Sequence, residues 1–193
     1  MKKIISRKHK ERKENMKQWI VGIILIGVML IGIVGGSFQG ILGNKDSSKK
    51  IVYNDFEFLA QGDYWVLEKD GGNFIFSYNP KEIERIEGNL NLINNYYNQP
   101  FYIFSKDNNA EGEVYQNLFY YNQLVQRMQK ACPEGENCAE NIPTKTCEDN
   151  FLIIKEGELS KIYQQNNCVF IEGKQEDLLK ITDEFLFKIL GIS

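Results

Sequence analysis

An apolar run from Trp19 to Gly36 constrains this chain more than any other feature of its sequence. The run contains no charged residue, and the uncharged segment from Ser37 to Leu42 extends it. About 20 apolar residues in a helix, at ~1.5 Å per residue, cross a hydrocarbon layer ~30 Å thick. The sequence therefore predicts a transmembrane helix over residues 19–42.

The charges on either side of this run predict its orientation. Residues 1–18 carry a net charge of +6, and residues 19–193 carry a net charge of −9. Basic residues beside a first apolar span stay in the cytoplasm. Those nearest the span are Lys8, Lys10, Arg12, Lys13 and Lys17. We therefore expect a single-pass protein of the cell membrane, with residues 1–18 as a cytoplasmic tail and the C-terminal domain outside the cell.

Three other interpretations of the apolar run fit less well. A cleaved signal peptide has a shorter apolar region and a small-residue cleavage site, for which only residues 35–37 qualify. A pilin-type leader would carry its processing site just before the apolar helix, where this chain has residues 16–18, Met-Lys-Gln. A buried helix of a globular domain needs no one-sided basic flank. An uncleaved signal anchor that begins at Trp19 accounts for the long apolar run and for the basic flank before it.

Three of the glycines in residues 19–42, Gly32, Gly36 and Gly40, form a doubled G-x-x-x-G pattern. This spacing allows two membrane helices to approach closely, although glycine is also common in membrane helices that do not pair. The basic tail is suited to contact the anionic headgroups of the lipid bilayer. No aromatic residue separates its cations, so we expect no nucleic acid among the partners.

Residues 43–50 are small and charged and are predicted to be a linker, which leaves residues 51–193 for one extracytoplasmic domain. Alternating or compact apolar segments predict strands at residues 51–59, 64–68, 74–78, 101–104, 151–154 and 168–171. Asp70-Gly71 predicts a hairpin turn. Helices are expected in a short segment after Asn79-Pro80, over residues 113–131 and from about residue 175. The fold class is therefore α+β, a mixed and largely antiparallel domain in the order β-β-β-α-β-α-β-β-α.

The end of the chain resembles a known group of proteins. The residues that carry the resemblance are Asn167-Cys-Val-Phe-Ile-Glu-Gly173, then residues 176–192, and further back Pro143-Thr-Lys-Thr-Cys147. These segments are similar to the C-terminal end of small, uncharacterised, membrane-anchored proteins from archaea. The resemblance covers about the last third of the chain and implies a membrane-anchored archaeal protein, but it implies no activity.

The composition excludes several kinds of chemistry in the outer domain. The chain has one histidine, His9, which lies in the predicted cytoplasmic tail. Catalysis by Ser-His-Asp or Cys-His groups and histidine-ligated zinc are therefore not expected outside. The chain has no phosphate-binding glycine loop, no H-E-x-x-H, no EF-hand loop and no C-x-x-C. We expect no cofactor.

Four cysteines, Cys132, Cys138, Cys147 and Cys168, are an even number in a domain that we place in an oxidising compartment. Their spacing lacks the close pairs of a zinc site, so two disulfides are favoured over zinc or free thiols. The segment between Cys132 and Cys138 contains a proline and a glycine and can turn back on itself. We therefore predict the pairs Cys132–Cys138 and Cys147–Cys168.

Acidic residues and tyrosines supply further candidates. A carboxylate pair for glycoside hydrolysis would come from Asp177, Asp183, Glu184, Glu156, Glu158 and Glu172. A calcium site would use Asp107, Glu111 and Glu113, although their spacing matches no known loop. The aromatic candidates for a binding patch are Tyr96, Tyr97, Tyr120 and Tyr121. For most of these residues a solvated surface or a core position is the ordinary explanation.

The sequence thus favours a membrane-tethered extracytoplasmic protein that acts as a protein-interaction or envelope-assembly module rather than as an enzyme. Its expected partners are the lipid bilayer and other membrane or cell-surface proteins. The alternative is a membrane-anchored hydrolase that acts on envelope polymers with carboxylates, independent of histidine. A pocket that gathers acidic side chains would favour the enzyme, and an exposed apolar patch would favour the module.

Overall fold

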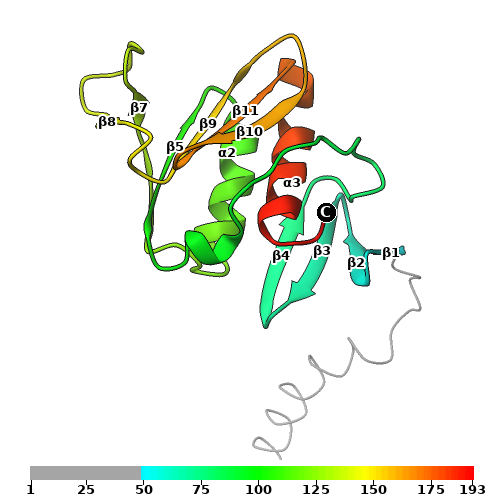
Figure 1. The fold of residues 1–193 in the computed structure, drawn as a ribbon. Coiled ribbons are helices and arrows are strands. Elements are labelled where there is room, and N and C mark those ends of the chain that lie inside the picture. The colour runs from blue at the N-terminus through cyan, green and yellow to red at the C-terminus, as the bar shows by residue number, and fades with distance from the viewer. Residues whose placement is uncertain (1–48) are drawn as a thin grey trace, which may run out of the picture. The chain divides into compact units, whose positions relative to one another are not determined.

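The structure is a computed structural model and describes residues 49–193 (Figure 1). The predicted span over residues 19–42, with Trp19, Gly32, Gly36 and Gly40, lies outside the described residues, and so does the basic tail. Among the residues that are described, no helix is both long enough and apolar enough to cross a membrane. These residues form one compact unit.

The chain first forms a four-stranded antiparallel sheet. Its strands are β1 (Lys50–Tyr53), β2 (Phe56–Gln61), β3 (Tyr64–Lys69) and β4 (Gly72–Phe76), and they lie in sequence order. Asp70 and Gly71 have positive φ angles of 52° and 79°, so the hairpin predicted there is confirmed. The strand predicted at residues 51–59 is instead a second hairpin. Asn54 and Asp55, with φ of 45° and 67°, make its two-residue turn, which short polar side chains tolerate.

A second, five-stranded sheet is mixed. Its strands are β5 (Pro100–Ser105), β6 (Arg127–Lys130), β9 (Phe151–Glu156), β10 (Lys161–Gln165) and β11 (Cys168–Gly173), in the order β10-β11-β9-β5-β6. Only the β10–β11 pair is antiparallel, because β11, β9, β5 and β6 run parallel to one another. The expectation of a largely antiparallel domain is therefore wrong for this sheet. The central strands are near-continuous apolar segments with both faces covered, as parallel strands require.

Two helices accompany the sheets. The first, α2 (Asn108–Tyr115), continues into a π-helical turn, η2 (Gln116–Tyr120), and the second is α3 (Leu178–Ile189). Short 3₁₀ turns are η1 (Ile93–Asn95) and η3 (Gln175–Asp177). The terminal helix predicted from about residue 175 is confirmed. It is followed by Gly191 at φ 71°.

The long helix predicted over residues 113–131 is wrong at both ends. Helix α2 begins at Asn108 because Asp107 caps it, accepting a hydrogen bond from Ala110 N at 2.7 Å. The helical path ends by Gln123, which has a positive φ of 48°. Met128 then belongs to β6. The short helix expected after Asn79 is likewise only a turn, closed by a bond from Glu82 N to Asn79 O.

Helix α3 lies between the two sheets, beside α2 (Figure 1). All residues from 181 to 190 are buried, so this helix meets protein on every side. Phe187 lies 4.7 Å from Phe76 and 5.8 Å from Phe58, measured between ring centroids, and joins the helix to the four-stranded sheet. One core thus contains side chains from both sheets and both helices.

The other face of the five-stranded sheet carries a smaller apolar cluster built around Tyr102, Phe151 and Ile153. Residues 131–150, here named the cystine loop, lie beside it and contain the two-residue strands β7 (Cys132–Pro133) and β8 (Thr144–Lys145). Two disulfides are present, Cys132–Cys138 with Cα atoms 6.0 Å apart and Cys147–Cys168 with Cα atoms 4.8 Å apart. This is the pairing that the spacing favours, and the second bond ties the loop to β11.

Candidate functional site

The structure brings two of the predicted acidic residues together, although they were assigned to different kinds of site. Asp183 on α3 and Glu113 on α2 are buried, and both face the chain just after β4. Glu113 Oε1 accepts a hydrogen bond from Ser77 N at 2.6 Å, and Asp183 Oδ2 accepts one from Tyr78 N at 2.8 Å. The two carboxyl groups therefore hold consecutive backbone amides.

This carboxyl pair favours a shared proton. Burial, followed by the negative charge of Glu113, raises the pKa of Asp183 well above its ordinary value of 3.8. The remaining oxygen, Asp183 Oδ1, is buried without a hydrogen-bond partner of its own. Two carboxyl groups in a dry site do not both ionise at low cost. Because the pair is almost inaccessible to solvent, its role is to join α2, α3 and the end of β4 rather than to act on a substrate.

The other predicted acids do not converge on the pair. Glu184, also on α3, forms a buried ion pair with Lys188, at 3.5 Å between charged atoms. Glu172 accepts a hydrogen bond from the Tyr163 hydroxyl at 2.8 Å and also faces Lys155 at 3.3 Å. The remaining two carboxylates of the strand ends, Glu156 and Glu158, are exposed.

The candidates for a calcium site have separate partners. Asp107 caps α2 through one oxygen and accepts a hydrogen bond from Gln175 Nε2 at 2.7 Å through the other. Glu111 lies 2.9 Å from Lys130 Nζ, and Glu113 holds Ser77. Within the described residues, no group of three or more acidic, cysteine or histidine side chains is arranged to hold a metal ion.

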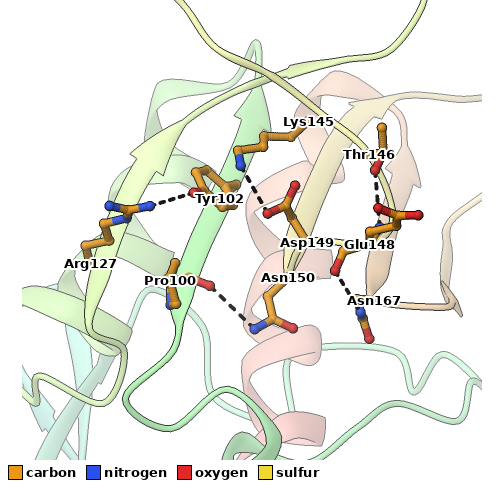
Figure 2. Close-up of polar contacts among 9 residues, drawn as sticks. All are labelled: Pro100, Tyr102, Arg127, Lys145, Thr146, Glu148, Asp149, Asn150 and Asn167. Atoms are coloured by element: carbon orange, nitrogen blue, oxygen red, sulfur yellow. Dashed lines mark hydrogen bonds and ion pairs between the residues drawn. The ribbon is translucent and has the colours of Figure 1, made fainter.

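A second polar cluster surrounds the phenol of Tyr102 on β5 (Figure 2). Arg127 Nη2 donates a hydrogen bond to the Tyr102 hydroxyl at 2.8 Å. Lys145 Nζ lies 4.2 Å from the centroid of the Tyr102 ring and 3.1 Å from Asp149 Oδ1. In the same region, Asn150 Nδ2 donates a hydrogen bond to the carbonyl oxygen of Pro100 at 3.4 Å. The phenol therefore connects β6 to the cystine loop across β5.

The charges around Tyr102 shift its ionisation. Burial by itself raises the pKa of this phenol, but hydrogen bonds and charge from Arg127 and Lys145 outweigh burial and lower the pKa below 10.0. Asp149, and then Tyr102, raise the pKa of Lys145 in turn. The Tyr102 side chain is 3% exposed, which keeps solutes away from it. The cluster is suited to fasten the cystine loop onto the sheet.

Two pockets lie elsewhere in the described residues. The first, of about 500 Å³, is bordered by the segment after Asn79 and the start of α3. It gathers the acidic side chains Glu82, Glu84, Glu87 and Asp177 together with Arg85 and Lys180. The second, of about 410 Å³, lies between the β3–β4 turn, η1 and the end of η2. Its mouth carries Tyr97 and Tyr121.

Exposed tyrosines gather beside the second pocket. Tyr120 is 62% exposed, and its ring centroid lies 5.0 Å from that of Tyr121 and 6.4 Å from that of Tyr115. Tyr121 and Tyr97 line the same pocket. We name Tyr97, Tyr115, Tyr120 and Tyr121 the tyrosine face. Tyr96 does not belong to it, because it is 1% exposed and packs edge-on against Phe101 at 5.4 Å.

The tyrosine face lies where two uncharged segments meet. Residues 89–101 and residues 114–126 contain no charged side chain, although charged residues make up 25% of the chain. The two segments are joined by backbone hydrogen bonds, from Asn98 N to Leu124 O at 2.8 Å and from Gln126 N to Gln99 O at 2.9 Å. Their exposed side chains are mainly tyrosine, asparagine and glutamine. The result is a neutral, aromatic and amide-rich surface.

Sequence reasoning missed Tyr115 on this face and the whole Tyr102 cluster. The two uncharged segments are a signal that was present in the sequence, and their alignment would have identified Tyr115. No comparable signal marks Tyr102, Arg127 and Lys145, because the parallel strands that bring them together were not predicted.

Comparisons with known proteins assign no family to this chain. They give no support to the expected resemblance to archaeal membrane-anchored proteins. No family model, no curated protein and no solved structure matches this chain.

Proposed function

We propose that this protein is a membrane-tethered extracytoplasmic binding module whose tyrosine face contacts another membrane or cell-surface protein. The observation that carries the proposal is the meeting of two uncharged segments to expose four tyrosines together. Protein interfaces are enriched in tyrosine and depleted of charged residues at their centres. Tyrosine and asparagine are also the residues that binding loops favour, because tyrosine supplies a large contact area at a low entropic cost.

The exposure of these side chains supports a role beyond packing. Tyr97 and Tyr120 are each 62% exposed, and Tyr121 is 51% exposed. Single exposed apolar residues are ordinary, whereas a group of neighbouring aromatic rings is a typical mark of a contact site. The π-helical turn that presents Tyr120 adds to this, since such turns occur frequently at functional sites.

The membrane tether is the other half of the proposal. It depends on the apolar run from Trp19 and on the basic residues before it. The two disulfides favour an oxidising compartment for the domain. Protease added to intact cells should therefore remove the C-terminal domain. A domain that is digested only after cell lysis would contradict the tether and the orientation together.

Site-specific photo-crosslinking tests the contact. A benzophenone amino acid placed at Tyr120 in the full-length protein, in its native cells, should yield one dominant adduct with a membrane or surface protein. The same probe at Tyr64, which is 53% exposed on β3, is the matched control. The adduct should weaken when Tyr115 is changed to serine beside the probe. Equal labelling at Tyr64 and Tyr120 would overturn the assignment.

A second candidate is a hydrolase that uses carboxylates, and one observation favours it. The pocket of about 500 Å³ gathers four acidic side chains, including Glu82 and Asp177. Paired carboxyl groups at a suitable separation hydrolyse glycosides without histidine. Against this role, Arg85 lies 3.9 Å from Glu87, and Glu82 accepts a hydrogen bond from Asn79 N at 3.1 Å. Loss of polymer hydrolysis in both Glu82→Gln and Asp177→Asn, with the fold intact, would establish this activity.

A further inference from the structure

The pocket between Tyr97 and Tyr121 has features that the contact with a protein partner does not require. It encloses about 410 Å³ and is entered beside the tyrosine face. Its lining includes the apolar side chains of Phe74, Ile93 and Leu190. Small-molecule sites combine such an apolar wall with a few placed polar groups. The pocket can therefore hold a ligand of its own.

The polar groups at the mouth of this pocket are neutral overall. Asn94 and Asn122 contribute side-chain amides. Lys69 and Asp70 contribute opposite charges that form an ion pair at 2.5 Å. A ligand with a net charge would find no uncompensated partner here. An entirely apolar ligand would offer the side-chain amide of Asn94 no hydrogen bond, whereas Asn122 is already bonded to Asn73 and Lys69 to Asp70.

A ligand that fits these conditions is uncharged, has an apolar face and has hydrogen-bonding groups around its rim. A sugar ring has this form, because its C–H groups lie on its faces and its hydroxyl groups point outward. Tyr97 and Tyr121 offer aromatic faces for the C–H groups, and their hydroxyls are polar ends. Asn94 offers both a donor and an acceptor for hydroxyl groups.

The geometry points to the Tyr97–Tyr121 pocket as a binding site for a neutral saccharide unit. This site goes beyond the proposed protein contact, because it shares Tyr97 and Tyr121 with the tyrosine face but adds the pocket that these two residues line. Gly72, which also lines the pocket, lies against Asn122. A Cβ atom at Gly72 would come within 2.7 Å of Asn122 Oδ1. The hydrogen bonds of Asn122 with the backbone of Asn73 hold its amide against β4.

The test is titration of the full-length protein with neutral disaccharides, followed by saturation-transfer NMR and calorimetry. The protein is held in lipid nanodiscs, since detergents with sugar headgroups would compete for the pocket. The probes are cellobiose, mannobiose, lactose and N,N′-diacetylchitobiose, each with its tetrasaccharide where one exists. If the ligand is part of a polymer, the tetrasaccharide should bind more tightly than the disaccharide. If the ligand is a free sugar, the two should bind equally tightly.

The expected result is saturable binding of at least one probe to the wild-type protein. Tyr97→Ala and Tyr121→Ala should each weaken this binding about tenfold, the loss expected for one aromatic contact. Tyr97→Phe should retain most of the affinity because it keeps the ring. Tyr64→Ala removes an equally exposed tyrosine outside the pocket and should change nothing.

Three results would overturn the proposal. The first is that none of the probes binds the wild-type protein. The second is that Tyr97→Ala and Tyr121→Ala bind sugar as tightly as the wild type. The third is that Tyr64→Ala loses binding to the same extent. The crosslinking experiment at Tyr120 reports on the protein contact separately, so the two proposals can fail independently.

Discussion

The side-chain amide of Asn117 takes the place of a neighbouring strand beside Ile75. Its Oδ1 accepts a hydrogen bond from Ile75 N at 2.8 Å, and its Nδ2 donates to Ile75 O at 2.7 Å. Asn122 repeats this arrangement with the backbone of Asn73, at 3.0 Å for both bonds. Asn117 and Asn122 are five residues apart, and the π-helical turn between them brings their amides onto Ile75 and Asn73, which are two residues apart on β4. The helical segment therefore keeps step with β4 and closes the edge of the four-stranded sheet.

Changing Asn117 to alanine should destabilise the domain by about 2 kcal/mol, because it leaves the backbone N–H and C=O of the half-buried Ile75 without their side-chain partners. Asn117 itself is fully buried, so water cannot readily replace the amide. Urea unfolding of the wild type and the variant measures the difference in the free energy of unfolding.

The matched control is Asn122→Ala, which removes the same two contacts at the exposed end of the strand. Asn122 is only half-buried, and its bonds to Asn73 are exposed to solvent. We expect a loss of at most about 1 kcal/mol there. Equal effects of the two substitutions would show that burial does not determine how much this edge contact contributes to the free energy of unfolding.

The positions of these asparagines show where sequence reasoning stops. Val114 and Leu118 lie on the buried side of the helix, as their spacing predicts. The same spacing continues through Val125 and Met128, which nevertheless leave the helix. Apolar residues in the segment and strand that follow a helix can continue the helical spacing of three and four residues over a short distance. Asn122 follows Asn117 by five residues, and the π-helical turn brings it to the same edge of β4. This turn has no sequence signal of its own.

Local signals were more reliable where turn chemistry or a long apolar pattern was present. Asp70-Gly71 predicted its hairpin, and the pattern from Leu178 to Ile189 predicted the terminal helix. The parallel order of β11, β9, β5 and β6 depends on contacts between distant segments, which no local pattern records. The Tyr102 cluster depends on that order. The tyrosine face was predicted in part, because Tyr97, Tyr120 and Tyr121 are exposed and Tyr96 is not.

Changing Asp183 to asparagine should flatten the pH dependence of stability. The pKa of Asp183 is raised in the folded protein, chiefly by burial, so the folded state retains a proton that the unfolded chain releases. The contribution of this group is therefore fully present at acid pH, below its ordinary value of 3.8, and is lost as the pH rises toward the raised value. Asparagine resembles the protonated form and does not titrate.

The variant should therefore gain stability relative to the wild type as the pH rises above 3.8, the ordinary pKa of this carboxyl group. Its Oδ1 can still accept the hydrogen bond from Tyr78 N, which an alanine cannot do. Burial also raises the pKa of Glu184, but that contribution is common to both proteins and cancels in the difference. Chemical unfolding at several pH values measures the effect. Parallel stability curves for the two proteins would contradict the shared proton.

Removing the Cys147–Cys168 disulfide should cost more stability than removing Cys132–Cys138. The cysteines of the first bond are 21 residues apart in the sequence, and those of the second are 6 residues apart. In the chain-entropy model the rings that these bonds close contribute about 3 and about 2 kcal/mol. Double serine variants of each pair, unfolded in urea without reductant, measure the two losses. The opposite ranking would show that strain or packing, rather than chain entropy, controls these bonds.

Tyr102 should be the first tyrosine of the domain to ionise as the pH rises. Arg127 and Lys145 overcome the effect of burial and lower its pKa below 10.0, whereas Tyr96 and Tyr163 have pKa values raised to about 12. Because the unfolded chain then binds the phenolic proton more tightly than the folded protein, the contribution of Tyr102 to stability grows as the pH rises through this window.

Near-ultraviolet absorbance follows tyrosinate formation, over the pH range in which circular dichroism reports an unchanged fold. Tyr102→Phe should remove the earliest component, and Arg127→Gln or Lys145→Gln should move it to higher pH. Lys155→Gln is the control, since Lys155 lies over Phe170 rather than Tyr102. An earliest component that survives in Tyr102→Phe would refute the assignment and, with it, the electrostatic link between the cystine loop and the sheet.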